Sequence, residues 1–204
     1  MDQNLEMNKK KFFSKILLFG EYGIIKNSKA LVIPYKKFYG SLKFSSKLDD
    51  IQKFSNINLK QLSKYLKNNE FVSNRINTLK LDSDIENGLY FESIIPQSYG
   101  LGSSGAVVAA IYESYKKEVF VDFEINDLKL ILSLMESFFH GQSSGIDPLS
   151  CYIQKPLLVE SKNSISIINI PPQNTNSKRT LFLLDTKYEG NTQSLVEIFL
   201  KKLR

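Results

Sequence analysis

The sequence predicts an α+β fold on two kinds of pattern. Short continuous apolar runs, such as residues 16–19 and 30–33, are typical of buried strands. Residues 127–139 instead repeat apolar side chains at spacings of three and four, which predicts an amphipathic helix. With 204 residues, the chain is long enough for one large or two small domains around a hydrophobic core.

The first half of the chain is expected to contain four strands and two helices. Residues 1–11 are polar and are expected to fray, and Pro34 follows the second strand. Leu42 and Phe44 alternate with other residues, which indicates a strand with one wet face. The remainder of residues 45–87 is polar and is expected to be irregular. The expected strands are residues 16–19, 30–33, 40–44 and 89–95, and the expected helices are residues 59–67 and 103–117.

The second half begins with the clearest helix, at residues 127–139. Asn126 or Asp127 is expected to cap its start, and Gly141 and Gly145 are expected to end it. Prolines followed by polar residues make 171–177 the best candidate for a linker. The further strands are expected at residues 157–160, 165–170 and 181–184, and a last helix at residues 193–203.

Composition indicates a globular protein of a reducing compartment. Hydrophobic residues make up 42% of the chain. The single cysteine, Cys151, excludes an internal disulfide and is expected to be a small buried apolar residue. No run of 18 apolar residues and no secretory signal occurs, so we expect a cytoplasmic protein without a membrane partner. The net charge of +6 comes from scattered lysines, so we expect no nucleic-acid partner.

A glycine-rich loop at residues 96–106 (PQSYGLGSSGA) stands between an apolar strand and a helix. Glycines let the backbone approach a ligand, and a helix N-terminus presents free N–H groups to a phosphate. The two serines add hydroxyls that can bind phosphate oxygens or a metal ion. The pattern is neither the Walker loop nor the dinucleotide motif. The alternative is a tight turn in which Ser103 or Ser104 caps a buried helix.

A second group of polar residues surrounds the end of the clear helix. Glu136 and His140 are four residues apart and share a helix face, with Glu136 on the flank of the apolar stripe. Asp147 is expected on a glycine-rich turn, so the two carboxylates could converge on one Mg²⁺ ion between ATP phosphates. The alternatives are that Glu136 is a solvated helix acid and that His140 is a cation at the helix C-terminus.

Three segments together resemble the signature of the GHMP small-molecule kinases: residues 15–22 (KILLFGEY), 96–106 and 136–147 (ESFFHGQSSGID). They lie in the family's order, and the resemblance runs from about residue 15 to the end. The form at residues 140–147 is most similar to that of the mevalonate kinases. The resemblance implies transfer of the ATP γ-phosphate to the hydroxyl of mevalonate in isoprenoid precursor synthesis, with Mg²⁺ as cofactor, and it is compatible with a homodimer.

The resemblance also implies roles for individual residues. Asp147 matches the catalytic aspartate that takes or orients the proton of the substrate hydroxyl, and Lys15 matches a lysine beside that hydroxyl. Ser104 and Glu136 match the Mg²⁺ ligands. The positions that match the mevalonate pocket are Glu21, His140 and Gly145. The phosphate loop corresponds to Gly100, Leu101, Gly102, Ser103, Ser104, Gly105 and Ala106.

The chain departs from the family pattern at a few positions near these motifs. Ser98 and Tyr99 stand where the loop usually has Gly and Ala, Ser143 stands where mevalonate kinases usually have Pro, and Pro148 stands where Asn is common. These departures bear on the acceptor more than on the reaction. A related sugar or small-alcohol kinase, such as a galactokinase-like enzyme, is therefore one alternative. A non-catalytic nucleotide-binding fragment is the alternative from another class.

The resemblance implies two domains. Residues 1–172 would form the N-terminal domain of the family, a ribosomal protein S5 domain 2-like fold that binds ATP and substrate. Residues 173–204 would be a linker and the beginning of a truncated ferredoxin-like C-terminal domain. The family's third glycine-rich motif, which belongs to that second half, has no counterpart in the sequence. The chain is therefore expected to be a fragment or a protein without the closing domain.

Overall fold

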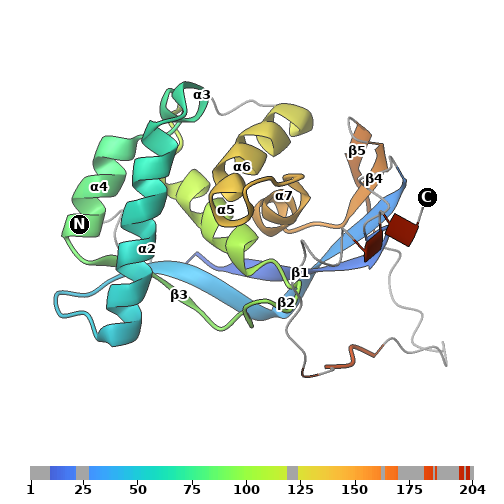
Figure 1. Ribbon diagram of the computed structural model, residues 1–204, viewed down its shortest axis with the longest axis horizontal. Helices are drawn as coiled ribbons and strands as arrows, with labels where there is room; N and C mark the ends of the chain where they lie inside the picture. The colour runs from blue at the N-terminus through green and yellow to red at the C-terminus, as the bar shows by residue number, and fades with distance from the viewer. Residues whose placement is uncertain are drawn as a thin grey trace.

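The computed structural model describes residues 10–21, 28–118, 124–161 and 164–169, and near the end of the chain residues 182–185, 187, 198–199 and 201–202. Within these residues, an antiparallel sheet lies along one side and the helices pack above it (Figure 1). Helices gathered on one face of an antiparallel sheet are typical of α+β proteins. The arrangement therefore agrees with the predicted fold class.

Strand β2 is the centre of the sheet. It pairs with β1 along most of one edge, with β3 at its C-terminal end and with β4 at its N-terminal end, and β4 pairs with β5. All four pairs are antiparallel. The strands are Phe12–Phe19 (β1), Ala30–Phe44 (β2), Leu89–Ser93 (β3), Leu157–Ser161 (β4) and Ser164–Ile167 (β5).

Two strands were predicted at residues 30–33 and 40–44, but the structure joins them in β2, which continues through Pro34. Pro34 lies opposite Lys15 of β1, and the Lys15 N–H donates to the Leu101 carbonyl at 3.0 Å, away from β2. In such a pair neither residue directs its N–H at the other strand. A proline, which lacks the N–H, is therefore tolerated there.

The prediction that residues 45–87 are mostly irregular was wrong. Helix α2 begins at Asp50 rather than at residue 59, because Asp49 and Gln52 form a capping box at its start. Asn77 likewise caps α4 by accepting a hydrogen bond from the Lys80 N–H. The helices of the described residues are Asp50–Lys67 (α2), Glu70–Ser73 (α3), Thr78–Glu86 (α4), Ser103–Tyr115 (α5), Ile125–His140 (α6) and Ile146–Ile153 (α7).

The start of the clearest helix, α6, differs from the prediction. Its N-cap is Glu124, and no side chain caps it, so neither Asn126 nor Asp127 has the predicted role. Gly141 ends the helix as predicted, and its N–H donates to the Ser137 carbonyl at 2.8 Å.

Helix α7 was not predicted. Gly145 was expected to help end α6, but it is instead the N-cap of α7, with a left-handed φ of 77°. Asp147 consequently lies in the first turn of a helix and not on a turn between elements. A helix N-terminus favours a negative charge, which suits an aspartate there.

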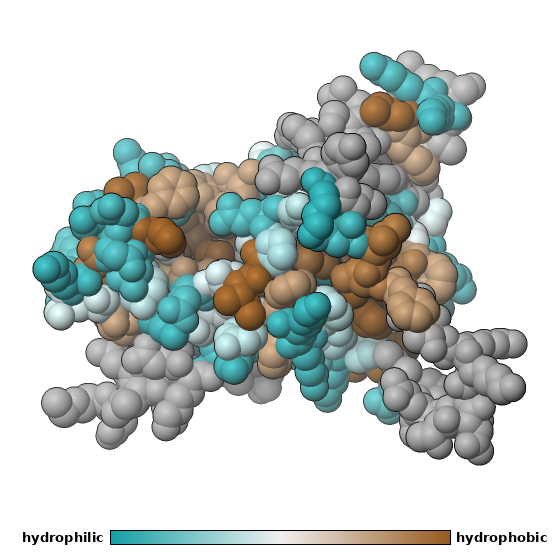
Figure 2. All heavy atoms as spheres, turned by 90° about the horizontal axis from the view of Figure 1, so that it is seen from below, coloured by the Kyte–Doolittle hydropathy of each residue, from teal (hydrophilic) through white to brown (hydrophobic). Residues whose placement is uncertain are grey.

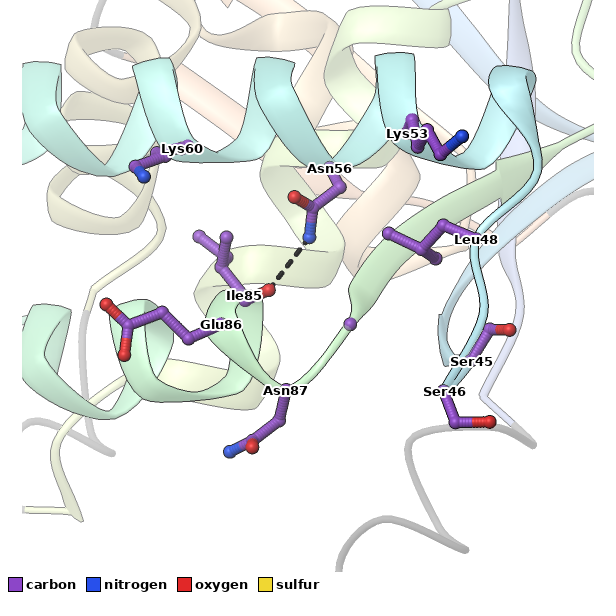
Figure 3. A pocket seen from close by; sticks show the side chains of 10 residues that line it. Ser45, Ser46, Leu48, Lys53, Asn56, Lys60, Ile85, Glu86 and Asn87 are labelled. Carbon is purple, nitrogen blue, oxygen red and sulfur yellow. Dashed lines mark hydrogen bonds between the residues drawn. The ribbon is translucent and has the colours of Figure 1, made fainter.

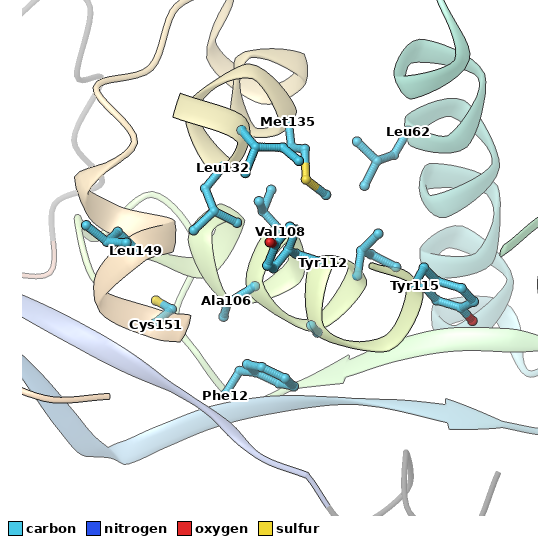
Figure 4. Packing of buried hydrophobic residues seen from close by; sticks show 14 of the residues in the cluster. Phe12, Leu62, Ala106, Val108, Tyr112, Tyr115, Leu132, Met135, Leu149 and Cys151 are labelled. Carbon is cyan, nitrogen blue, oxygen red and sulfur yellow. The ribbon is translucent and has the colours of Figure 1, made fainter. Parts of the chain in front are cut away.

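The hydrophobic core lies between the sheet and the helices, and α5 is at its centre (Figure 4). Small buried residues on α5, including Ala106, Ala109 and Ala110, let neighbouring elements approach it closely. Leu132 of α6 and Cys151 of α7 are also buried in this core, which confirms the expected environment of the cysteine. Because α5 is packed on several sides, its N-terminus is held in a fixed position.

The side of the molecule on which the sheet lies carries hydrophobic patches separated by hydrophilic side chains (Figure 2). Phe19 at the end of β1 is 69% exposed and Ile94 after β3 is 54% exposed. In the part of the chain that the structure describes, no helix is long and apolar enough to cross a membrane.

Most of the predicted second domain, residues 173–204, falls outside the described residues. This holds for the predicted linker at 171–177 and for most of the helix predicted at 193–203, of which residues 198–199 and 201–202 are helical. Residues 182–185 have no strand geometry, so the strand predicted at 181–184 is not found at its described positions.

Candidate active site

The glycine-rich loop leads directly into the N-terminus of α5. Gly102 precedes the helix with a left-handed φ of 79°, and no side chain caps the helix. The Ala106 N–H donates to the Gly102 carbonyl at 2.9 Å. The N–H groups of the residues between them have no acceptor within the helix. The alternative of a serine-capped turn is therefore wrong, and the helix end presents N–H donors suited to an anion.

The loop is strained and fastened to the sheet. Ser98, Gly100 and Gly102 all take positive φ values, of 62°, 66° and 79°. Glycine adopts such values without steric cost. Ser98 has a Cβ, so the same left-handed conformation is sterically unfavourable for it. The Leu101 carbonyl accepts the Lys15 N–H of β1 at 3.0 Å, which ties the loop to that strand.

Lys15 of β1 and Asp147 of α7 form an ion pair beside the loop, with Lys15 Nζ 2.9 Å from Asp147 Oδ1. The Lys15 side chain is only 5% exposed, whereas that of Asp147 is 36% exposed. Burial by itself would lower the pKa of Lys15, but the charge of Asp147 and its hydrogen bond outweigh burial and raise that pKa. The pair thus combines a fixed, buried cation with a carboxylate open to solvent.

Two glycines allow the loop to lie against this ion pair. A Cβ on Gly105 would lie 2.9 Å from the carbonyl carbon of Asp147, so α5 and α7 touch backbone to backbone. A Cβ on Gly102 would lie 3.0 Å from Cγ of Lys15 and 3.4 Å from Sγ of Cys151. The close packing brings the N–H donors of α5 and the carboxylate of α7 to one place.

Glu136 of α6 lies between two hydroxyl groups. Ser104 Oγ donates to Oε1 at 2.9 Å, and Ser143 Oγ donates to Oε2. Glu136 is only 3% exposed, so the alternative of a solvated helix acid is wrong. Burial, and then the charge of Asp147, raise the pKa of Glu136 to about 7, although the two hydroxyl groups and Lys15 lower it.

His140 is the last residue of α6, and its Nε2 lies 3.0 Å from Ser104 Oγ. The hydroxyl of Ser104 has one proton, which is directed at Glu136. The contact with His140 is therefore a hydrogen bond when Nε2 carries the hydrogen and donates it to Ser104. The position at the helix C-terminus also fits the alternative of a cation that interacts with the helix dipole.

The remaining residues predicted for a substrate pocket are Glu21 and Gly145. Glu21 is exposed just after β1, and its charge contributes to the raised pKa of Lys15. A Cβ on Gly145 would lie 2.5 Å from the carbonyl oxygen of Lys129, so this glycine lets α7 pack on α6. Contact of either residue with a substrate stays a prediction.

Two residues of the site were not predicted. Ser143 was noted only as a departure from a family pattern, although a serine two residues before a helix-starting glycine is a common hydrogen-bonding position. Cys151 lies beneath the loop, and its thiol donates weakly to the Gly102 carbonyl at 3.7 Å. Burial raises the pKa of the thiol well above its usual value, so Cys151 is neutral. Recognition of α7 would have placed Cys151 one helical turn from Asp147.

A separate open groove of about 510 Å³ lies between α2 and the turn that joins α4 to β3 (Figure 3). Asn56 faces it and donates to the Ile85 carbonyl at 2.9 Å. None of the predicted site residues lines this groove. It lies at the start of β3, whereas the glycine-rich loop follows the end of β3.

The fold is similar to that of solved kinase structures. The crystal structure of the Methanococcus jannaschii mevalonate kinase matches with a TM-score of 0.52 and 16% identity, over 78% of this chain and 55% of that chain. A second crystal structure of a mevalonate kinase matches over the same shares, with a TM-score of 0.50 and 16% identity. The chain thus spans about half the length of these structures, and at this identity the likeness shows the fold alone.

The sequence of the chain also matches a family model. No curated protein matches the chain. The family model described as the GHMP kinases N terminal domain matches residues 61–155. The matched residues include the glycine-rich loop, Glu136 and Asp147. Over these residues the chain is therefore similar to the N-terminal domain of the GHMP kinases.

Proposed function

We propose that this chain carries the nucleotide- and substrate-binding domain of a kinase that transfers the γ-phosphate of ATP to the hydroxyl of mevalonate. The observation that carries the proposal is the Lys15–Asp147 ion pair beside the uncapped N-terminus of α5. The family match supports phosphoryl transfer to a small molecule. The form of residues 140–147 and the likeness to mevalonate kinase structures favour mevalonate as the acceptor.

The N-terminus of α5 is the proposed site for the ATP phosphates. Its free N–H groups and the positive end of the helix dipole favour a polyphosphate. Gly100 leaves open space, since nothing lies within 4 Å of the position of a Cβ there. Phosphoryl transfer depends mainly on positioning and on neutralising charge, which such a rigid helix end provides.

Ser104 and Glu136 fit a magnesium ion. Both supply oxygen atoms, which Mg²⁺ prefers, and they are already 2.9 Å apart. Among the described residues, the hydrogen-bond donors to Glu136 are hydroxyls, and no lysine or arginine forms an ion pair with it. A buried carboxylate without a cationic partner is well suited to a metal ion. When bound, Mg²⁺ would neutralise charge on the transferring phosphoryl group.

Asp147 and Lys15 are the proposed acceptor site. Asp147 Oδ accepts the proton of the mevalonate hydroxyl as that oxygen forms its bond to the γ-phosphorus. The bond from the γ-phosphorus to the bridging oxygen breaks, and ADP leaves with that electron pair. Lys15 lies within 2.9 Å of Asp147 and stabilises negative charge on the hydroxyl oxygen during transfer. Glu21 and His140 are proposed to contact the substrate beside this pair.

Several finer assignments belong to the same proposal. They are an S5 domain 2-like topology for residues 1–172, the start of a second domain in residues 173–204, and a location in the cytoplasm.

ADP release by the purified chain, measured with Mg²⁺-ATP and R-mevalonate, galactose or no acceptor, tests the reaction. We expect release that depends on mevalonate. Faster release with galactose would support the sugar-kinase alternative, and nucleotide binding without acceptor-dependent release would support the non-catalytic one.

A further inference from the structure

Ser143 connects the two halves of the site through one hydroxyl group. Its Oγ donates to Oε2 of Glu136 and accepts the N–H of Gly145 at 2.9 Å. The carbonyl of Ser143 accepts a hydrogen bond from Ser133 Oγ of α6 at 2.6 Å. Gly145 begins α7, in whose first turn Asp147 lies. One serine therefore links the buried carboxylate of α6 to the helix that carries the acceptor-side carboxylate.

The direction of the Ser143 hydroxyl is determined by these contacts. Its oxygen accepts from Gly145, so its single proton is available for Glu136. Ser104, the other donor to Glu136, is itself a proposed metal ligand and would turn its oxygen toward the ion. Ser143 would then be the donor that remains on Glu136, at Oε2, while Oε1 faces the metal. A carboxylate restrained at one oxygen binds a metal with less loss of rotational freedom.

We propose that Ser143 is a positioning residue. It orients Glu136 for the divalent cation and fixes its position relative to the first turn of α7, which carries Asp147. This inference rests on the proposed function, since it assigns a residue to the metal-binding part of the same site. Proline, the usual residue of mevalonate kinases at this position, has no hydroxyl and could not make either contact. Both contacts therefore depend on the serine that this chain has at position 143.

The test is the binding of the Mn²⁺–ATP complex to the chain, measured from the enhanced relaxation of water protons by protein-bound Mn²⁺. Ser143→Ala removes the hydroxyl and should weaken Mn²⁺ binding by about tenfold or more, the usual effect of losing a group that holds a metal ligand. Ser143→Thr keeps the hydroxyl and should bind Mn²⁺ within about threefold of the unaltered chain. Thermal unfolding of each variant confirms that it is folded.

Ser137→Ala is the matched control. Ser137 lies on α6 next to Glu136, and its hydroxyl donates to the Ser133 carbonyl at 2.8 Å without contacting Glu136. It should leave Mn²⁺ binding unchanged. The inference is wrong if Ser143→Ala binds Mn²⁺ like the unaltered chain, if Ser143→Thr fails to restore binding, or if Ser137→Ala weakens it equally. Unaltered chain that binds no Mn²⁺ with ATP would overturn both this inference and the proposed function, whereas normal binding without transfer to mevalonate would overturn only the latter.

Discussion

Lys15 and Asp147 form an ion pair whose two members differ in their exposure to solvent. The lysine comes from the sheet and is buried, and the aspartate comes from the first turn of α7 and is 36% exposed. The ammonium group depends on its partner for compensation, whereas the carboxylate can be hydrated without it. The two residues should therefore respond differently to substitution.

Replacement of Asp147 by alanine should destabilise the fold more than replacement of Lys15 by methionine. Asp147→Ala leaves a buried ammonium without its partner and should cost about 3 kcal/mol of unfolding free energy. Lys15→Met keeps most of the apolar stem and leaves an aspartate that water can reach, so about 1 kcal/mol is expected. Urea unfolding at neutral pH measures both. The reverse order would show that the pair does not stabilise the chain in this way.

Gly105→Ala should damage the site, although alanine normally favours a helix. The added Cβ would lie 2.9 Å from the backbone of Asp147, and one helix must move away from the other. We expect a loss of about 1–3 kcal/mol in stability, typical of overpacking, and slower turnover. Gly141→Ala is the control, because its Cβ meets nothing within 4 Å and only its φ of 71° is unfavourable. If Gly105→Ala is as active as the control variant, the close contact has no functional importance.

Glu136→Gln should raise the Mg²⁺ concentration needed for half-maximal turnover by about tenfold or more, because one anionic ligand is lost. Its amide keeps a similar shape, and its single carbonyl oxygen can still accept one of the two serine hydroxyls. Glu160→Gln is a surface control, since Glu160 is exposed and lies on β4. The same Mg²⁺ titration for Glu136→Gln and the control would remove Glu136 from the metal site.

Without metal, Glu136 should make stability fall as pH rises. Burial and the charge of Asp147 raise its pKa from 4.5 to about 7 in the folded chain, so the folded state holds the proton more tightly than the unfolded state does. The unfolding free energy should therefore decrease between pH 4.5 and about 7, by on the order of 3 kcal/mol from this group, and then level off.

The comparison of Glu136→Gln with the unaltered chain isolates this effect. Urea unfolding in a metal chelator at pH 5 and pH 8 should show that the variant gains stability relative to the unaltered chain at the higher pH. Other titrating groups are common to both chains and cancel in the difference. An equal difference at both pH values would contradict the raised pKa.

The sequence was sufficient to predict an element where the pattern that defines it is local. The glycine-rich loop, β3, α5 and the end of α6 at Gly141 were predicted because glycine spacing and apolar periodicity act within a few residues. The predictions failed where tertiary structure decides. Polar residues 45–87 form helices because their caps and their packing on the sheet outweigh a weak apolar pattern.

The candidate site shows the same division. The resemblance of three motifs predicted that Lys15, Ser104 and Asp147 belong to one site. In the structure Lys15 pairs with Asp147, and Ser104 binds Glu136, whose pKa responds to the charges of both. The burial of Glu136 could not be predicted, because it depends on how α6 packs against α5 and on the Ser143 hydroxyl from a separate turn. Helix α7 was missed because a glycine such as Gly145, which starts α7 with a left-handed φ, is more often found at the end of a helix.

Phosphoryl transfer in the presence and absence of Asp147 tests the central claim most directly. The purified chain and its Asp147→Asn variant are supplied with Mg²⁺-ATP and R-mevalonate, and ³¹P NMR follows the γ-phosphate. We predict a new phosphomonoester signal that requires mevalonate, with a rate about 10²–10⁴-fold lower in Asp147→Asn, because a group that accepts the hydroxyl proton is lost. ATP binding should stay within a few-fold of the unaltered chain. Near-normal transfer by Asp147→Asn would contradict the role assigned to the Lys15–Asp147 pair.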